Sequence, residues 1–228
     1  MHTGGGRRQR EIAMNSIIAW GSLGLSVLLI LAYEIHAHQV SKRDPTHQAR
    51  FVNAHMRRAW VQAMSAQPGF EIVAVQALRN SLMSATVVAS TSALALMASL
   101  TLGGASLTAG LSHPSSESMT LLHVLLGATT VGVLFASYVC SAMSMRYYGN
   151  STQVMSMPVA SAERQRLNPL ATDYIQRAGR LYSWALRLFL MVVPMVIGFV
   201  HPLALVPATV ALLVALHFFD RPTPVELA

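Results

Sequence analysis

The sequence predicts an all-α membrane protein, a polytopic helix bundle of four to five spans with an amphipathic helix on its cytoplasmic side. Two observations lead to this fold class. Hydrophobic residues make up 53% of the 228 residues and charged residues only 11%, too few to cover the surface of a soluble protein. Long apolar segments also recur, each near the length that a helix needs to cross a bilayer. We expect a single transmembrane domain over residues 1–228.

Four apolar segments are predicted to span the membrane: residues 15–33, 80–102, 119–143 and 181–201. The second segment ends at Gly103. The last apolar stretch continues to Phe219, which is too long for one span. Because proline removes a backbone donor, we expect a helix end near Pro202. A further apolar helix is then expected over 203–219, which either spans or re-enters.

Basic residues predict the orientation. They concentrate in the connection between the first two spans and in the connection between the third and fourth, whereas 103–118 contains no Lys or Arg. Both basic connections lie on one side, because two spans separate them. The positive-inside rule makes that side cytoplasmic and the N-terminus external. We therefore expect a multi-pass protein of the bacterial inner (plasma) membrane.

The first basic connection contains a predicted amphipathic helix over 46–64, preceded by a start signal at Asp44-Pro45. Two interpretations remain open: the helix lies among lipid headgroups, or it packs on the ends of the spans. Under the first, contacts with anionic headgroups are expected from Arg50, Arg57, Arg58 and Trp60.

The second basic connection has a predicted helix from Leu170 onward. Its arginines are expected to snorkel to the membrane interface: Arg177, Arg180 and Arg187.

Residues 76–92 combine an apolar run with six Ser or Thr side chains. At 100° per residue, the polar positions form two stripes. The first stripe contains Asn80, Ser81, Ser84 and Thr91. The second contains Arg79, Thr86 and Ser90.

Two interpretations of these stripes stay open. Small polar residues let helices pack closely inside lipid. Alternatively, one stripe lines a water-filled path, and Arg79 at its mouth favours anions. Both interpretations hold in a homo-oligomer in which one stripe packs against a neighbouring helix and the other faces the axis of the assembly. Arg79 itself either serves such a path or only snorkels.

Several segments make the chain similar to a known family: the Gln76-Ala77-Leu78-Arg79-Asn80-Ser81 piece, Asp44-Pro45 before Arg58-Ala59-Trp60, Arg146-Tyr147-Tyr148, and Arg187 leading into Pro194. On these residues the chain resembles domain of unknown function 599, an uncharacterised membrane family of bacteria and plants. It departs from that family in the fourth span, where it has Phe199-Val200-His201-Pro202. The resemblance implies a small multi-span helical protein and no established reaction.

His123 and His201 lie in predicted apolar helices and are candidates for a polar or pH-sensing site. Histidine and methionine are ligands for copper, but no closely spaced ligand pair occurs inside a span. We therefore expect no metal site and no cofactor.

The motifs of soluble enzymes are absent, and the few carboxylates lie in tails, loops or span ends. We expect no enzymatic activity and no nucleic-acid partner. The predicted function is transport by a homo-oligomeric ion pore or channel-like protein, with anions slightly favoured. The alternative is a structural or accessory subunit that packs against other membrane proteins. A metal-dependent membrane enzyme is the third hypothesis. The lipid bilayer and its anionic headgroups are the remaining expected partners.

Overall fold

The computed structural model describes residues 4–43, 49–112 and 117–220, and these residues contain helices and turns but no strand. The helices are α1 (Gly4–Arg43), α2 (Ala49–Ala66), α3 (Glu71–Ser112), α4 (Glu117–Met155), α5 (Ala162–Val200) and α6 (Leu205–Asp220), with the short 3-10 helix η2 (Pro202–Ala204) before α6. The predicted all-α fold class is confirmed.

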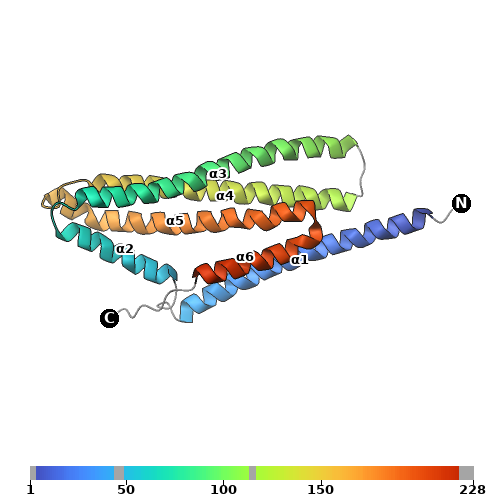
Figure 1. The fold of residues 1–228 in the computed structure, drawn as a ribbon, viewed down its shortest axis with the longest axis horizontal. Helices are drawn as coiled ribbons and strands as arrows, with labels where there is room; N and C mark the ends of the chain where they lie inside the picture. The colour runs from blue at the N-terminus through green and yellow to red at the C-terminus, as the bar shows by residue number, and fades with distance from the viewer. Residues whose placement is uncertain (1–3, 44–48, 113–116, 221–228) are drawn as a thin grey trace.

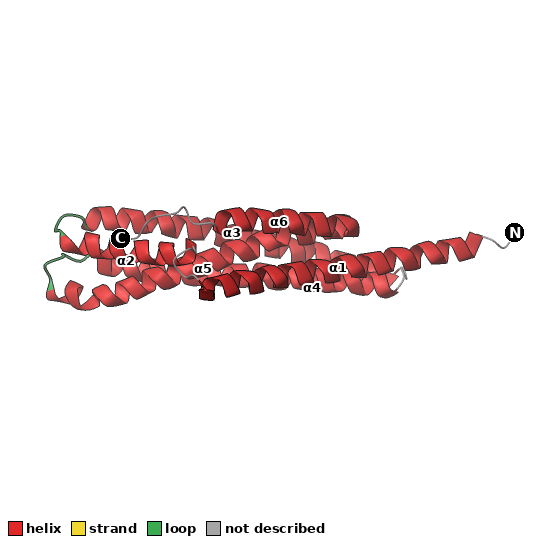
Figure 2. Cartoon of the chain, turned by 90° about the horizontal axis from the view of Figure 1, so that it is seen from below, coloured by secondary structure: helices red, strands yellow, loops and turns green. Residues whose placement is uncertain are grey.

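Three long helices form the body of the molecule. α3, α4 and α5 run side by side, and α6 turns back after η2 to lie along α1 (Figures 1 and 2). α2 lies against α5 at the end where the α2–α3 and α4–α5 turns meet (Figure 1). We call this end, formed by α2, the start of α3, the end of α4 and the start of α5, the basic end.

Small side chains hold the three long helices together. Up to Ser151, the buried residues of α4 recur every three or four positions, which is the spacing of a helix seam; they are Leu126, Thr130, Leu134, Ser137, Ser141, Ser144, Tyr148 and Ser151. The Ser137 hydroxyl lies 3.1 Å from that of Ser92 on α3 and donates to the Ala185 carbonyl of α5 at 2.8 Å. Such close helix approach is typical of bundles in lipid, where no hydrophobic drive acts between helices.

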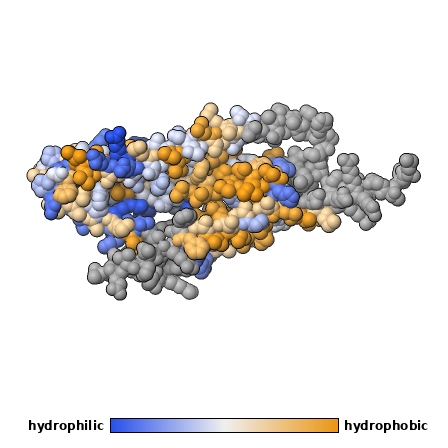
Figure 3. All heavy atoms as spheres, in the orientation of Figure 1, coloured by the Kyte–Doolittle hydropathy of each residue, from blue (hydrophilic) through white to orange (hydrophobic). Residues whose placement is uncertain are grey.

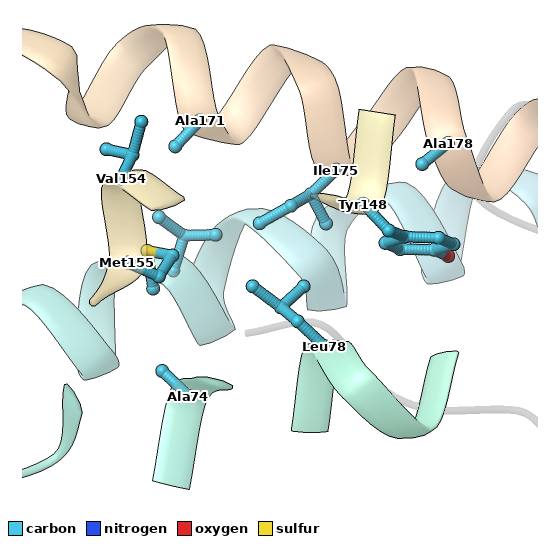
Figure 4. Close-up of a cluster of buried hydrophobic side chains, with 9 residues drawn as sticks. Ala74, Leu78, Tyr148, Val154, Met155, Ala171, Ile175 and Ala178 are labelled. Atoms are coloured by element: carbon cyan, nitrogen blue, oxygen red, sulfur yellow. The ribbon is translucent and has the colours of Figure 1, made fainter. Parts of the chain in front are cut away.

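The basic end has a separate apolar core built from four helices (Figure 4). Its buried residues are Val61, Ala74, Leu78, Tyr148, Val154, Met155, Ala171, Ile175 and Ala178. Trp60 and Met64 of α2 pack against this core. α2 therefore packs on the bundle through Val61, Trp60 and Met64, whereas Met56, Ala59 and Ala63 are exposed, so packing on the bundle and headgroup contact involve different sides of this helix.

The long helices exceed the thickness of a membrane. α3 has 42 residues and α4 and α5 have 39 each, so each is about 60 Å long against a hydrocarbon core of about 30 Å. Four helices, α1, α3, α4 and α5, are long and apolar enough to cross a membrane, and α6 is a shorter apolar helix. Hydrophobic surface gathers over the middle of the molecule, with hydrophilic residues toward the basic end (Figure 3). Each long helix thus has an apolar half and a part that extends beyond the hydrocarbon.

Two helix boundaries differ from those expected. α3 continues past Gly103 to Ser112, because glycine is tolerated inside membrane helices. α5 begins at Ala162 rather than near Leu170, with the Ser161 hydroxyl accepting a hydrogen bond from the Arg164 backbone N–H at 3.3 Å.

The predicted break near Pro202 is confirmed, since α5 ends at Val200 and η2 begins at Pro202. Pro169 and Pro194 lie inside α5 without ending it. The expected start of the amphipathic helix at Asp44-Pro45 lies outside the described residues.

Candidate functional site

An ion pair lies in the apolar half of the molecule, between α5 and α1. Arg187 Nη1 is 3.5 Å from Glu34 Oε1, and the two side chains are only 8% and 28% exposed. Arg187 was expected to snorkel to the interface with Arg177 and Arg180. The structure gives Arg187 a different contact, because its buried guanidinium turns toward Glu34 of α1, one residue beyond the predicted span 15–33, whereas the other two arginines are exposed.

The depth of Arg187 makes this pair unusual. It lies six residues beyond Leu181, where the apolar stretch of α5 begins, and this corresponds to about 9 Å along the helix. At nearly the same level, Ser137 bonds the Ala185 carbonyl in the α4–α5 seam. A charged group at this depth is costly and is retained in proteins only when a partner compensates it.

The pair joins two parts of the fold. α1 packs mainly on α6 through a small buried face of Ala19, Ser22 and Ser26. Glu34, two turns further along α1, reaches Arg187 on the three-helix bundle. The ion pair therefore adds a charged contact between α1 and α5 to the packing of α6 on α5 and of α1 on α4, and its strength depends on the absence of water.

A second buried arginine, Arg164, lies at the basic end and is fully buried. Its Nη1 donates to the carbonyls of Val154 at 2.8 Å and Met157 at 3.2 Å, and its Nε donates to Asn168 Oδ1 at 2.7 Å. The two carbonyls lie at the end of α4 and in the turn after it, where the last helical carbonyls have no partner in the helix, and Asn168 lies on α5. Arg164 thus closes the α4–α5 turn.

Glu71 closes the neighbouring turn. Its Oε2 accepts a hydrogen bond from the Gly69 N–H at 2.8 Å, and its Oε1 accepts one from the Val159 N–H at 3.1 Å. Gly69 has φ +93°, a conformation that favours glycine. The carboxylate therefore ties the α2–α3 turn to the α4–α5 turn.

The first predicted stripe lies largely on the outside of the protomer. Asn80, Ser84 and Thr91 are exposed, and Ser81 is half-buried. The three hydroxyls donate to carbonyls one turn earlier in α3: Ser81 to Ala77, Ser84 to Asn80, and Thr91 to Val87. These groups are satisfied by their own helix and make no contact that would define a path within one protomer.

The second stripe also faces outward. Arg79 and Ser90 are exposed, and Thr86 donates to the Leu82 carbonyl at 2.9 Å and to Met145 Sδ at 3.1 Å.

Contacts between helices show how far along the bundle the two stripes of α3 lie. Thr86 meets Met145, and the neighbouring Ser144 donates to the Ala178 carbonyl at 2.9 Å. Residues 79–86 therefore run beside the part of α5 that carries the exposed Asp173–Arg177 ion pair. Since exposed charges of this kind stay outside hydrocarbon, this part of α3 belongs to the basic end.

The sequence interpretation missed the serines of the α4 seam. Ser137 and Ser144 join α4 to α5, and Ser137 also meets Ser92. Their regular spacing with Ser141 and Ser151 every three to seven residues was the signal that could have identified them.

The two candidate histidines lie at the end of the molecule opposite the basic end. The His123 ring is 6.2 Å from the Phe199 ring, centroid to centroid, and His201 lies at the turn between α5 and η2. Within the described residues, no group of three His, Cys, Asp or Glu side chains could hold a metal ion.

The residues predicted to contact lipid headgroups have different environments in the structure. Arg58 is exposed, Arg57 is half-buried, and Trp60 packs against the apolar core of the basic end. The side chain of Arg50 lies outside the described residues.

Comparison with known proteins identifies a family rather than an activity. No curated protein and no solved structure matches the chain. The family model described as "Protein of unknown function, DUF599" matches residues 22–225, a range that includes α2 to α6 and both members of the Arg187–Glu34 pair. The protein is therefore a multi-span helical protein that belongs to the DUF599 family.

Proposed function

We propose that the protein is an integral membrane transport protein, a homo-oligomeric ion pore or channel-like protein in which ions pass beside the Arg187–Glu34 pair. The observation that carries the proposal is the burial of this pair in the apolar half. Ionisable residues at such a depth are rare, and in membrane proteins they mark ion paths and proton relays.

Arg187 accounts for a preference for anions. Its guanidinium offers five N–H donors, which can replace part of the hydration shell of an anion. In the structure Glu34 balances this charge at 3.5 Å. An anion that enters between α1 and α5 competes with Glu34 for the same donors.

The outer face of α3 supports assembly into a homo-oligomer. Thr91 is exposed on this face beyond the part of α3 that belongs to the basic end, and a second copy would cover it with the small-residue packing that is common between membrane helices. Asn80 and Ser84, exposed at the basic end, would lie in the same contact outside hydrocarbon. The positive-inside rule supports an inner-membrane location with the basic end in the cytoplasm.

A second candidate function is that of a structural or accessory subunit. It is favoured by Ile72, Val73 and Met83, which are 71%, 50% and 59% exposed on α3. These apolar side chains lie at the basic end, where hydrocarbon does not cover them. A different membrane protein that packs on this face would bury them.

Ion flux into liposomes tests the transport proposal. The wild-type protein is expected to pass small anions such as chloride or nitrate faster than sodium or potassium. Arg187→Gln should remove that preference, and Glu34→Gln should increase it, because the guanidinium then lacks its counter-charge. Arg180→Gln, an exposed arginine of the same helix, is the matched control and should leave selectivity unchanged.

Two outcomes would contradict transport. One is the absence of wild-type flux with any common anion or cation across a range of pH. The other is selectivity that is the same in wild type, Arg187→Gln and Glu34→Gln. A stable complex with a different membrane protein after gentle extraction, together with no flux, would favour the accessory role.

A further inference from the structure

The guanidinium of Arg57 lies directly against the backbone of α5 at Gly179. A Cβ atom added to Gly179 would overlap the Cζ, Nη1 and Nη2 atoms of Arg57. Only glycine leaves this space, so the chain has a notch in α5 that holds one specific arginine of α2. The neighbouring Arg58, in contrast, is exposed and makes no such contact.

One hydroxyl group lies near this arginine. Tyr148 of α4 is within electrostatic range of Arg57, and Ser81 of α3 and Tyr182 of α5 lie close to Tyr148 rather than to the guanidinium. We call Arg57, Gly179 and Tyr148 the Arg57 cluster. Tyrosine and serine hydroxyls donate hydrogen bonds as readily as they accept them, and a guanidinium only donates.

The Arg57 cluster has positive charge without a balancing carboxylate. Among the described residues, the ion pairs are Arg177 with Asp173 and Arg187 with Glu34, and neither involves Arg57. Arg180, next to Gly179, adds a further positive charge. A half-buried guanidinium beside a tyrosine hydroxyl, with no ion-pair partner among the described residues, is a binding environment for an anion.

The position of the cluster indicates where that anion comes from. Gly179 precedes Leu181, the first residue of the apolar stretch of α5, by two positions. The cluster thus lies at the boundary between the apolar half and the basic end. Phosphate groups of membrane lipids lie at this level, and basic residues attract the anionic ones.

We propose that Arg57, held in the Gly179 notch and accompanied by Tyr148, binds a phosphate group, supplied by the headgroup of an anionic phospholipid. The planar guanidinium matches two phosphate oxygens at once, which a lysine cannot do. This site is separate from the Arg187–Glu34 pair and does not depend on the proposed transport function.

Retention of lipid tests the proposal. The full-length protein is reconstituted in nanodiscs of phosphatidylcholine with increasing phosphatidylglycerol, and bound phosphatidylglycerol is counted by native mass spectrometry. Arg57→Ala is expected to weaken its retention about tenfold, whereas Arg58→Ala should change it little. Arg57→Lys keeps the charge but loses the paired donors, so it should give an intermediate value.

Gly179→Ala provides a second, independent variant. It leaves every charge in place and displaces the guanidinium, so it should also reduce retention. If Arg57→Ala does not fold, as judged by its circular dichroism and melting curve, Gly179→Ala decides the question. Retention equal to wild type in Gly179→Ala and in any folded Arg57→Ala would overturn the proposal.

Competition by inorganic phosphate separates the two sources of the ligand. A lipid site should keep its phosphatidylglycerol when millimolar phosphate is added. Displacement of the lipid by phosphate at that concentration would overturn the assignment to a headgroup and assign the cluster to a soluble phosphate compound.

Discussion

Two buried arginines satisfy their donors in different ways. Arg164, at the basic end, donates to the carbonyls of Val154 and Met157 and to the Asn168 amide oxygen. Arg187, in the apolar half, is paired with the carboxylate of Glu34. Arg164 is stabilised mainly by neutral acceptors around a turn, with the Glu71 carboxylate of α3 within electrostatic range, whereas Arg187 pairs directly with a carboxylate of a different helix.

The difference follows from the backbone around each arginine. Near Arg164, α4 ends and its last carbonyls lack helical partners, so they are available as acceptors. Around Arg187, the helices continue and their carbonyls accept bonds within each helix, except that Pro194 supplies no donor to the Leu190 carbonyl. Glu34 supplies a charged acceptor from α1. Arg187 therefore draws on a carboxylate of another helix, whereas Arg164 draws mainly on the carbonyls of a turn.

The largest expected effect is on the turn arginine. Arg164→Ala removes every donor at once and leaves the Val154 and Met157 carbonyls buried without that partner. We expect a loss of about 4 kcal/mol in the free energy of unfolding, measured by chemical unfolding in mixed micelles. Arg166→Ala, an exposed neighbour on the same helix, is the control and should change stability by less than about 0.5 kcal/mol. Equal effects of the two variants would show that the Arg164 contacts do not stabilise the turn.

A smaller but still large effect is expected at Glu34. Glu34→Ala leaves Arg187 buried without this carboxylate, and we expect a loss of about 2 kcal/mol, at the low end for buried pairs because Glu34 is 28% exposed. α1 should also be released from the bundle, which hydrogen exchange along α1 and α5 would detect. Glu163→Gln, an exposed carboxylate of α5, should leave both measurements unchanged. Wild-type exchange in Glu34→Ala would contradict a role of the pair in holding α1.

A modest effect is expected in the serine seam between the two arginines. Ser137→Ala removes the bonds to Ser92 and to the Ala185 carbonyl, and hydrogen bonds between membrane helices are worth about 1 kcal/mol. Ser84→Ala removes a bond only to its own helix, to the Asn80 carbonyl, and should have no measurable effect. The comparison of unfolding curves tests whether the seam or the outer stripe stabilises the bundle. A greater loss in Ser84→Ala would reverse that assignment.

The smallest effect is expected for the exposed pair on α5. Arg177 lies 2.8 Å from Asp173, but both side chains are about half exposed, and solvent screens such pairs. Arg177→Ala should leave the melting temperature unchanged within error. A clear decrease would show that the exposed surface of the basic end contributes more to stability than the two buried arginines imply.

The sequence was sufficient for the fold class and for the α5–α6 break, because hydropathy and proline act locally. The sequence did not show which residues of neighbouring helices lie side by side. Residues 82–88 are apolar and read as part of a span, yet the contact of Thr86 with Met145 sets them beside the charged part of α5. That alignment depends on the contacts of the α4 seam with its neighbouring helices. The residue pattern of one helix does not show such contacts.

The unknown alignment of the helices also explains why the sequence did not identify the candidate site. Arg187 and Glu34 are 153 positions apart, and hydropathy alone assigned Arg187 to the interface. The exposed stripes of α3 were visible in the sequence, but their relation to the bundle was not. A seam of serines at regular spacing could have been found, since helix periodicity is a local property.

The central claim is that Glu34 and Arg187 compensate each other inside the apolar half. A double-mutant cycle with Glu34→Gln, Arg187→Gln and the combined variant tests it directly through the free energy of unfolding. We predict that each single change destabilises the protein and that the combined variant loses less than the sum, by about 1–3 kcal/mol. Strictly additive losses would contradict the claim, because they would show that the two charges do not interact.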